Sequence, residues 1–552
     1  MKRLYFFVFL IISVFSVLYA EENLENIPLD DPVYAILSQC YSEGWIEYLP
    51  QIRPYRRNQV VSLLNQAIDS IPIDSDKFLS DTAKIHLQRI KKAQKQLQTS
   101  TEEKTVGFFN FPLEATLNAV LNRPGDSVPS LGFSIDAGFY HDNLYFLSLS
   151  NRVQLQLLPW TTPPYRYLQE PPRWDYNYYT WFLSQGTEGF NHNAEHLPGE
   201  IDMSMVMNNI TQTTVDFGLL TFHMGRDVLD WGPSPIANLC LSKTAKAYDY
   251  FRFDMPIGPQ GTYTWMTGFL QDFTGIGSAD IDQKMVTSHR AEMQFTPWFL
   301  FAIYESVIYS SRFEMAYLNP LSLYYISEVR LGDYDNKLGG ADFIFKLPKS
   351  LIYLSIFADD WHTAEHIINP LYYHNIWAGL IGYKIYDLIP RLDLFVEYAH
   401  MSHWMYTHRE VLGHSNNYSH YGSHLGHFLE PNSHMLQIDA SYTLSPQLKI
   451  GLSSWIIQHS LGTIDQSFED LGWDLGAYTN FIDTYHYLDF NVPGIHHETN
   501  VDLTLYGEYS LPELGALIKA FYSFEFTHNL NQEADIQRVD HFLTVEARFF
   551  RY

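Results

Sequence analysis

The sequence predicts an all-β transmembrane barrel, with a small N-terminal α-helical module in front of it. Three observations lead to this prediction: an apolar leader, a high aromatic content without any long apolar segment after the leader, and a hydrophobic pattern of period two over most of the chain. Strand-plus-connection lengths typical of outer-membrane barrels allow about 18 antiparallel strands, within a range of roughly 16 to 20.

The first twenty residues have the layout of a secretory signal peptide. Lys2 and Arg3 form a positive start, an apolar run extends from Leu4 to Leu18, and the small residue Ala20 precedes an acidic segment. We expect residues 1–20 to be removed after export. An uncleaved membrane anchor is the alternative, and it is disfavoured because the apolar run is short for a spanning helix.

The composition limits the class of protein. The net charge of −27 argues against nucleic acid and anionic lipid headgroups as ligands. The two cysteines, Cys40 and Cys240, cannot form a disulfide framework. Aromatic residues make up 16% of the chain, yet after the leader no stretch approaches the ~20 apolar residues of a transmembrane helix. An exported chain of this kind fits an outer-membrane β-barrel, whose strands alternate lipid-facing and lumen-facing residues.

Residues 21–105 have helical periodicity and are expected to form a periplasmic module. Two segments carry apolar residues at positions i, i+3, i+4 and i+7, and a third covers residues 76–98 with lysines on its opposite side. The apolar positions of the first two segments are Val33, Ile36, Leu37 and Cys40, and Val60, Leu63, Leu64 and Ala67. The module is thus predicted to contain three helices.

From residue 106 the period changes to two, and residues 106–552 are predicted to form the barrel. FPLEATLNAVL, LGFSIDAGF, LSLSNRVQLQL, LDLFVEYA, LQIDASYTL, LKIGLSSWI and VDLTLYGEY all alternate apolar and polar residues. A soluble β-sandwich or propeller also alternates, but the chain shows no repeat of the length of a propeller blade. Charges at mid-strand positions such as Glu114, Asp136 and Asp502 fit a polar lumen better than a soluble sheet.

One segment carries a family resemblance. In GRDVLDWGPSPIANLCLSKTAKAYDYFRF, residues 225–253, Gly225 and Arg226 precede Trp231, Gly232 and Pro233, and a Leu-Ser pair follows before an aromatic strand. This pattern resembles the signature of the Wzi family of capsule assembly proteins. Asp230 lies inside the same motif.

Four further segments resemble the same family in the same order. They are residues 27–46, which resemble its helical periplasmic segment; residues 313–325, which resemble a strand with a Leu-Asn-Pro step at Asn319 and Pro320; residues 335–348; and residues 425–452, with Gly426 and His427. The chain departs from the family pattern at Ser234 and Glu430, where glycine is common. These departures put the bound sugar in doubt more than the fold.

The resemblance implies a function as well as a fold. It implies an outer-membrane barrel of about 18 strands with a periplasmic helical bundle, acting without catalysis as a surface lectin that holds capsular or other surface polysaccharide on the cell. Outer-membrane lipid and the polysaccharide export machinery are the further expected partners, and no cofactor is implied. The alternative function is a porin, an acidic channel for small solutes.

A histidine-rich stretch, residues 400–434, suggests a metal site as an alternative. His420, His424 and His427 stand at i, i+4 and i+7, a spacing that places three imidazoles on one face of a helix. Gly422 and Gly426 make a helix improbable there. We therefore expect a loop approaching a strand at Met435, with no bound metal.

The candidate sugar-binding residues are aromatic. Flat rings beside polar acceptors suit a pyranose, which has an apolar C–H face and a rim of hydroxyl groups. The hypothetical platforms are Trp160, Trp174, Trp181 and Trp404. An interfacial aromatic girdle is an equally good explanation of the same rings.

Arg226 and Asp230 are expected to form a structural charge pair in the lumen. A ligand contact is the less favoured alternative for these two side chains. No serine has a nucleophile-elbow pattern around it, so no enzyme is predicted.

Overall fold

The structure is a computed structural model of the chain. It describes residues 26–29, 31–71, 87–88, 90–91, 93–94, 105–120, 129–144, 147–159, 203–273, 281–310, 312–332, 334–360, 376–402, 404–408, 416–420, 423–459, 497–511, 516–529 and 534–551. The expected signal peptide, residues 1–20, lies outside these ranges.

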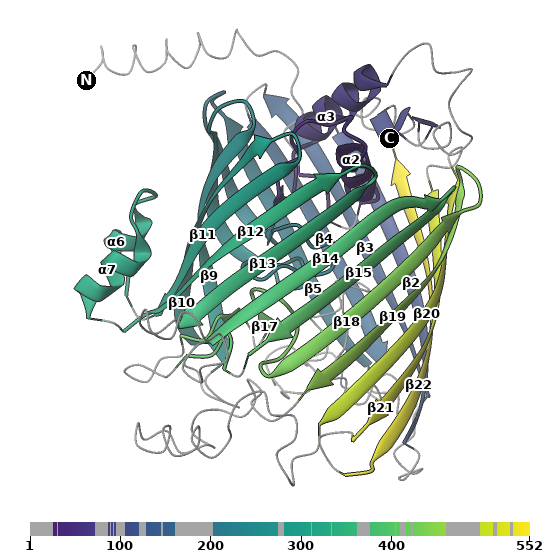
Figure 1. Ribbon diagram of the computed structural model, residues 1–552. Coiled ribbons are helices and arrows are strands. Elements are labelled where there is room, and N and C mark those ends of the chain that lie inside the picture. Colours follow the sequence, from purple (N-terminus) through teal and green to yellow (C-terminus); the bar gives the residue numbers. More distant parts are fainter. Residues whose placement is uncertain are drawn as a thin grey trace.

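Eighteen strands form a closed barrel (Figure 1). In chain order they are β2 (Thr105–Val120), β3 (Pro129–Leu144), β4 (Leu147–Pro159), β5 (Met203–Asp216), β6 (Thr221–Asp227), β8 (Tyr248–Pro256), β9 (Gly261–Phe273), β10 (Ile281–Thr296), β11 (Phe299–Ser310), β12 (Asn336–Leu347), β13 (Ser350–Asp360), β14 (Ile376–Ile389), β15 (Leu392–Met401), β18 (Ser433–Thr443), β19 (Leu448–His459), β20 (Glu498–Leu511), β21 (Ala516–His528) and β22 (Gln537–Arg551).

The first and last strands close the barrel. β2 pairs antiparallel with β3 on one side and with β22 on the other, with Leu113 opposite both Phe133 and Val545. Every other barrel strand also pairs antiparallel with its two neighbours. Closure leaves no unpaired edge among these strands, as a membrane barrel requires. The predicted fold class is therefore confirmed.

The two ends of the barrel differ in their connections. At one end, here called the turn end, short connections such as residues 217–220, 297–298 and 390–391 join the strands. At the other, here called the loop end, the connections are longer, and two of them are residues 228–247 and 402–432. Short turns on one side and long loops on the other are typical of outer-membrane barrels.

The barrel wall has an apolar outside and a polar inside. In β20, Asp502 and Thr504 are buried toward the lumen, whereas Leu503 and Leu505 are exposed on the outside. This alternation explains the period-two pattern of the sequence, because neighbouring side chains of a strand point to opposite faces.

An aromatic girdle marks the outer wall at the turn end. The ring of Trp298, in the turn between β10 and β11, lies 5.8 Å from Phe299 and 6.3 Å from Phe345, centroid to centroid. Trp298 is 54% exposed. Amphipathic rings of this kind gather where the hydrocarbon layer meets water. The girdle therefore marks one boundary of the membrane layer.

The N-terminal module covers the turn end. Its helices are α2 (Val33–Ser42) and α3 (Arg57–Ser70), and they coincide with the first two predicted helices. The described residues of the third predicted segment are also helical, and Ile90 is buried in the module's core. None of the described helices is long and apolar enough to span a membrane.

A helical hairpin stands beside the barrel rather than at its ends (Figure 1). It consists of α6 (Met315–Leu318) and α7 (Tyr324–Leu331), and it belongs to the connection between β11 and β12. Residues 313–325 were predicted to form a strand, so that prediction is wrong. Glu314 accepts a hydrogen bond from the N–H of Ala316 and thus caps α6, and Pro320 lies in the turn between the helices.

Candidate functional site

Three segments meet inside the barrel and form what we call the plug. Residues 46–56 enter from the turn end, and residues 228–247, the inner loop, enter from the loop end. Residues 402–432, the histidine loop, also enter from the loop end. Their apolar side chains share one buried core with the inner wall from β8 to β19, so the plug is packed against the barrel rather than suspended in it.

Segments from opposite ends of the barrel pair with each other inside the lumen. β1 (Ile52–Arg53) runs antiparallel to β7 (Asp230–Trp231), with Ile52 opposite Trp231. The pairing continues beyond the strands, because the N–H of Gly232 donates to the carbonyl oxygen of Gln51 at 2.8 Å. The N-terminal segment and the inner loop are therefore held together by main-chain hydrogen bonds.

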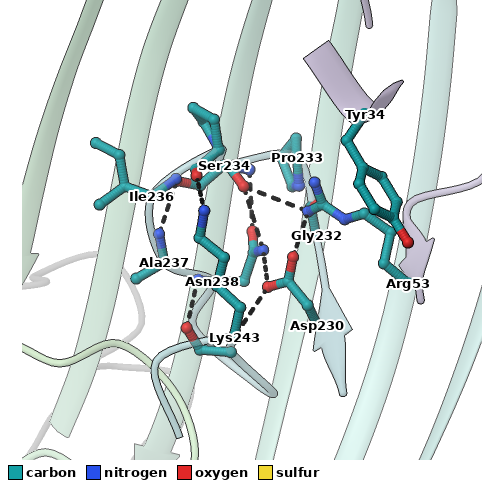
Figure 2. A network of polar contacts seen from close by, with 12 residues as sticks. Tyr34, Arg53, Asp230, Gly232, Pro233, Ser234, Ile236, Ala237, Asn238 and Lys243 are labelled. Atoms are coloured by element: carbon teal, nitrogen blue, oxygen red, sulfur yellow. Dashed lines mark hydrogen bonds and ion pairs between the residues drawn. The ribbon is translucent and has the colours of Figure 1, made fainter. Parts of the chain in front are cut away.

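A buried ion pair reinforces this pairing (Figure 2). The guanidinium of Arg53 lies 2.9 Å from the carboxylate of Asp230, which is 1% exposed. Arg53 also donates to the carbonyl oxygen of Gly232 at 2.6 Å, and Asp230 accepts from Asn238 Nδ2 at 2.7 Å. A buried carboxylate needs such partners, because an unpaired buried charge costs several kcal/mol.

Polar side chains also fix the shape of the inner loop (Figure 2). The hydroxyl of Ser234 accepts from the N–H groups of Ile236 at 3.0 Å and Ala237 at 3.2 Å. The amide oxygen of Asn238 accepts from the N–H of Ser234 at 3.0 Å. Ser234, a departure from the family pattern, thus organises the turn that it occupies.

Gly232 is required by this geometry. Its φ is +138°, and a Cβ added there would lie 2.4 Å from Oδ1 of Asn238. Any other residue would combine a strained backbone with displacement of the side chain that binds Asp230. The Trp-Gly-Pro step of the sequence motif is therefore explained by the fold of the inner loop.

Lysines connect the inner loop to itself and to the barrel wall. Lys384 of β14 donates to the carbonyl oxygen of Pro233 at 3.1 Å. Lys243 donates to the carbonyl oxygen of Pro235. Burial lowers the pKa of Lys243 to about 8, although the nearby Asp230 carboxylate opposes this effect.

The histidine loop packs on the inner loop through Gly426 and Tyr406. The hydroxyl of Tyr406 donates to the carbonyl oxygen of Leu239 at 2.7 Å. A Cβ on Gly426 would meet that same carbonyl oxygen at 2.1 Å, so only glycine allows this approach. The Leu-Gly-His motif thus serves the contact between the two loops.

His427 is fully buried beside this contact. Its Nδ1 accepts a hydrogen bond from the N–H of Leu429 at 3.1 Å, and its ring stacks on Phe428 with centroids 4.6 Å apart. Burial lowers the pKa of His427 to about 3. The neutral form is therefore the one that fits the plug.

The three histidines of the metal hypothesis do not converge. His420 lies in β16 (Ser419–His420), which pairs with β17 (Ser423–His424). The Nδ1 of His420 accepts from the N–H of Gln271 at 3.0 Å, so this ring faces the wall. Within the described part of the chain, no group of three or more His, Cys, Asp or Glu side chains is arranged to hold a metal ion.

The expected charge pair between Arg226 and Asp230 is wrong. Asp230 pairs with Arg53, whereas Arg226 lies opposite Asp249 on the neighbouring strand, with 3.4 Å between NH1 and Oδ2. Arg226 shares the outward face of β6 with the exposed Met224. The side chains of a strand alternate between its two faces, so Arg226 cannot reach the lumen.

The predicted aromatic platforms have different outcomes. Trp160, Trp174 and Trp181 lie outside the described residues. Trp404 is 5% exposed and belongs to the buried core of the plug, with a φ of +63°. Its ring therefore serves packing in this conformation, which does not favour the predicted role as a sugar platform.

Sequence reasoning missed a second set of buried charges. Arg290 of β10 lies 3.0 Å from Glu292 and 2.6 Å from Asp342. Glu292 in turn accepts hydrogen bonds from the N–H of Gln51 at 2.9 Å and the hydroxyl of Tyr48 at 2.8 Å. Mid-strand charges in the sequence indicated a polar lumen, but they could not indicate which segment would fill it.

Comparisons with known proteins agree with this architecture. The family model described as capsule assembly protein Wzi matches residues 210–538, more than half of the chain. Among curated proteins no match is found.

Solved structures with a similar fold include three outer-membrane barrels. One is an Escherichia coli protein described as Wzi, an outer membrane protein involved in group 1 capsule assembly and a carbohydrate binding β-barrel, with 12% identity, coverage of 95% of this chain and 99% of that chain, and a TM-score of 0.57. The others are OccAB4 of Acinetobacter baumannii, with 10% identity, coverage of 81% and 98% and a TM-score of 0.43, and OpdQ of Pseudomonas aeruginosa, with 8% identity, coverage of 81% and 98% and a TM-score of 0.43.

Proposed function

The chain belongs to the Wzi family of capsule assembly proteins and is an outer-membrane β-barrel, and from this premise we propose that it binds surface polysaccharide and holds it on the cell. The proposed activity is binding without catalysis. Capsular or other surface polysaccharide is the proposed ligand, and the loop end is the proposed binding face, because long loops of outer-membrane barrels face the outside of the cell.

The plug is the observation that carries this proposal over the porin alternative. The main-chain pairing of β1 with β7 joins a segment from the turn end to a segment from the loop end. An open channel requires a continuous aqueous path through the lumen. Buried apolar packing and a buried ion pair lie across that path instead, which supports a binding protein rather than a pore.

The proposed orientation puts the N-terminal module in the periplasm. The module sits on the turn end, where Arg56 pairs with Asp216 at 2.5 Å and the hydroxyl of Tyr386 donates to Ser38 at 2.8 Å. Residues 21–105 then face the compartment through which the polysaccharide is exported. We propose that they contact the export machinery.

The sugar-binding residues are proposed to come from the long loops. Trp160, Trp174 and Trp181 belong to the connection between β4 and β5, which leaves the barrel at the loop end. Aromatic rings at that end would meet the polysaccharide as it emerges on the cell surface.

The experiment is the partition of surface polysaccharide between cells and medium, with the gene intact and deleted. We expect deletion to move polysaccharide into the medium without lowering its total. The same deletion complemented by a triple variant, Trp160→Ala, Trp174→Ala and Trp181→Ala, should release polysaccharide as the deletion does, while a matched Trp298→Ala variant at the turn end should retain it. An unchanged partition in the deletion strain would overturn the proposal.

Conductance in planar bilayers is the second measurement. The intact protein is expected to give no steady conductance. A steady conductance together with an unchanged partition would favour the porin instead.

A further inference from the structure

The α6–α7 hairpin folds away from the lumen. The connection between β11 and β12 leaves the barrel at the loop end and then turns back along the outer wall, where Figure 1 shows the two helices at the side of the barrel. Its turn reaches β9, because the hydroxyl of Tyr263 donates to the carbonyl oxygen of Pro320. The hairpin therefore lies at the depth of the strands, beside them.

Tyrosines attach the hairpin to the wall. Tyr317 and Tyr324 are fully buried, and they pack with Val307 and Tyr309 on the outward face of β11. The ring centroids of Tyr309 and Tyr317 are 5.0 Å apart, and those of Tyr317 and Tyr324 are 5.9 Å apart. The hydroxyl of Tyr317 donates to Asp335 at 2.7 Å. This packing makes the hairpin a fixed part of the wall.

The hairpin covers polar groups on the outside of the barrel. His289 and Glu305 lie on the outward faces of β10 and β11, with 3.2 Å between Nε2 and Oε2. The ring of Tyr324 stacks on His289 at 4.5 Å, and its N–H donates to Glu305 at 3.0 Å. Ionisable groups facing hydrocarbon are costly. The hairpin shields these two from whatever surrounds the barrel.

The main chain of the turn is suited to surroundings without water. The N–H of Leu321 donates to Oδ1 of Asn319 at 3.1 Å, and the N–H of Ser322 donates to the carbonyl oxygen of Asn319 at 3.0 Å. Pro320 has no N–H, and its carbonyl oxygen accepts from Tyr263. Irregular backbone at membrane depth requires internal partners of this kind, which gives the Leu-Asn-Pro motif a physical reason.

The outward face of the hairpin is apolar and uncharged. No charged residue occurs from Met315 to Ser327. Leu321, at the turn, is 79% exposed. The exposed large apolar side chains of the hairpin and its flanks are Phe313, Met315, Leu321, Leu323, Tyr325, Ile326, Val329 and Tyr334.

The charges of the connection gather toward the loop end instead. Arg312 pairs with Asp335, and Lys337 lies 2.8 Å from Glu328. These residues adjoin the ends of β11 and β12 where the connection leaves and re-enters the barrel. The connection thus has a charged base near the membrane surface and an apolar tip at depth, as snorkelling side chains have around a buried segment.

We propose that the α6–α7 hairpin is a lipid-contact element of the outer leaflet, with its exposed face covered by acyl chains. An apolar patch of this kind marks an interaction site. Lipid is the occupant that fits, because the patch continues the exposed apolar surface of the wall, which includes Phe269 of β9 and Ile303 of β11. The proposal goes beyond polysaccharide binding and depends only on the outer-membrane location.

Spin-label accessibility in liposomes tests this proposal. A nitroxide is attached to the Leu321→Cys variant of the full chain, and the buried Cys40 and Cys240 are controlled for by labelling the unsubstituted chain. Leu503→Cys on the outside of β20 is the lipid-facing control, and Lys349→Cys in the turn between β12 and β13 is the water-facing control. We expect Leu321→Cys to match Leu503→Cys, with a ratio of oxygen to nickel-chelate collision several-fold above that of Lys349→Cys.

Two results would overturn the proposal. Nickel-chelate access at Leu321→Cys equal to that at Lys349→Cys would place the hairpin in water. Low access to both reagents, with spin–spin broadening that disappears when labelled protein is diluted with unlabelled protein, would show that a second copy covers the face. Heat-modifiable migration in detergent gels confirms for each variant that the barrel has formed.

Discussion

The inner loop and the α6–α7 hairpin leave the same end of the barrel and fold in opposite directions. The inner loop enters the lumen and buries the carboxylate of Asp230, which is 1% exposed. The hairpin turns outward and presents Leu321, which is 79% exposed. Each has a proline in its turn, Pro233 in one and Pro320 in the other, so turn residues alone do not set the direction.

The difference lies in the partners that each segment finds. The polar groups of the inner loop meet Arg53 and Lys384 inside the barrel. The hairpin has its charges at its base, and its tyrosines find apolar and aromatic neighbours on the outer wall. A loop therefore folds toward the side on which its polar atoms are satisfied, since an unsatisfied buried polar group costs about 1–3 kcal/mol.

The largest expected effect comes from removing the charge that holds the inner loop. Asp230→Ala leaves Arg53 buried without its carboxylate, which costs roughly 3–5 kcal/mol. The thiol of Cys240 is a native reporter, because it is fully buried in the plug and burial raises its pKa to about 12. In a Cys40→Ser background, Asp230→Ala should raise the labelling rate of Cys240 by a hundredfold or more, a factor of about the size that cost implies.

Asp249→Ala is the matched control for this prediction. It removes an exposed partner of Arg226 on the outer wall, and exposed pairs contribute about 0–1 kcal/mol. Labelling of Cys240 should hardly change. Equal labelling in the two variants would mean that the Arg53–Asp230 pair does not hold the plug.

A somewhat smaller effect is expected at Gly232. Gly232→Ala places a residue with a Cβ at φ +138°, where strain costs on the order of 1–3 kcal/mol, and displaces Asn238. Gly258→Ala is the control, because its φ is +74° but nothing lies within 4 Å of the added Cβ. Cys240 labelling should rise in the first variant only, and a similar rise in both would remove the role given to Asn238.

The hairpin should respond to a different substitution. Tyr317→Phe removes the hydroxyl that donates to the buried Asp335, a hydrogen bond to a charged group that contributes about 1.5–3 kcal/mol. Tyr325→Phe changes an exposed ring and should be neutral. The nitroxide of Leu321→Cys should become more mobile only with Tyr317→Phe. Cys240 labelling should stay unchanged in both, and a shared response would contradict the independence of the two segments.

The smallest effect near neutral pH is expected from His427. Its pKa is lowered from 6.5 to about 3 by burial, so the unfolded plug binds a proton that the folded plug does not. Stability is therefore lost as the pH falls below 6.5, by no more than about 1.4 kcal/mol per pH unit. Cys240 labelling, corrected for thiolate fraction, should rise from pH 6.5 to pH 5, and less so in His427→Gln. An equal rise in that variant would assign the effect to other groups.

The sequence predicted the barrel well because each strand states its own geometry. Alternation in VDLTLYGEY predicts that Asp502 and Thr504 share one face and Leu503 and Leu505 the other, as they do. Helical spacing likewise predicted α2 and α3. Both patterns reflect local periodicity against a single boundary, between the apolar and polar sides of one element.

The candidate site was less predictable because its residues are brought together across the chain. The motif at residues 225–253 was recognised, but the partner of Asp230 is Arg53, in a segment without any periodic signal. The pairing with Arg226 failed since these residues lie on opposite sides of the wall. The strand predicted for residues 313–325 failed because the capping by Glu314 and the break at Pro320 favour two short helices.

By itself the sequence determined a closed, alternating wall and a helical module, because both follow from the spacing of apolar residues along the chain. The tertiary structure alone decided which connection fills the lumen and which lies outside it. That choice depends on buried partners, such as Arg53 for Asp230 and Glu305 for Tyr324. These partners lie in other segments, and only closure of the barrel brings them within hydrogen-bonding distance.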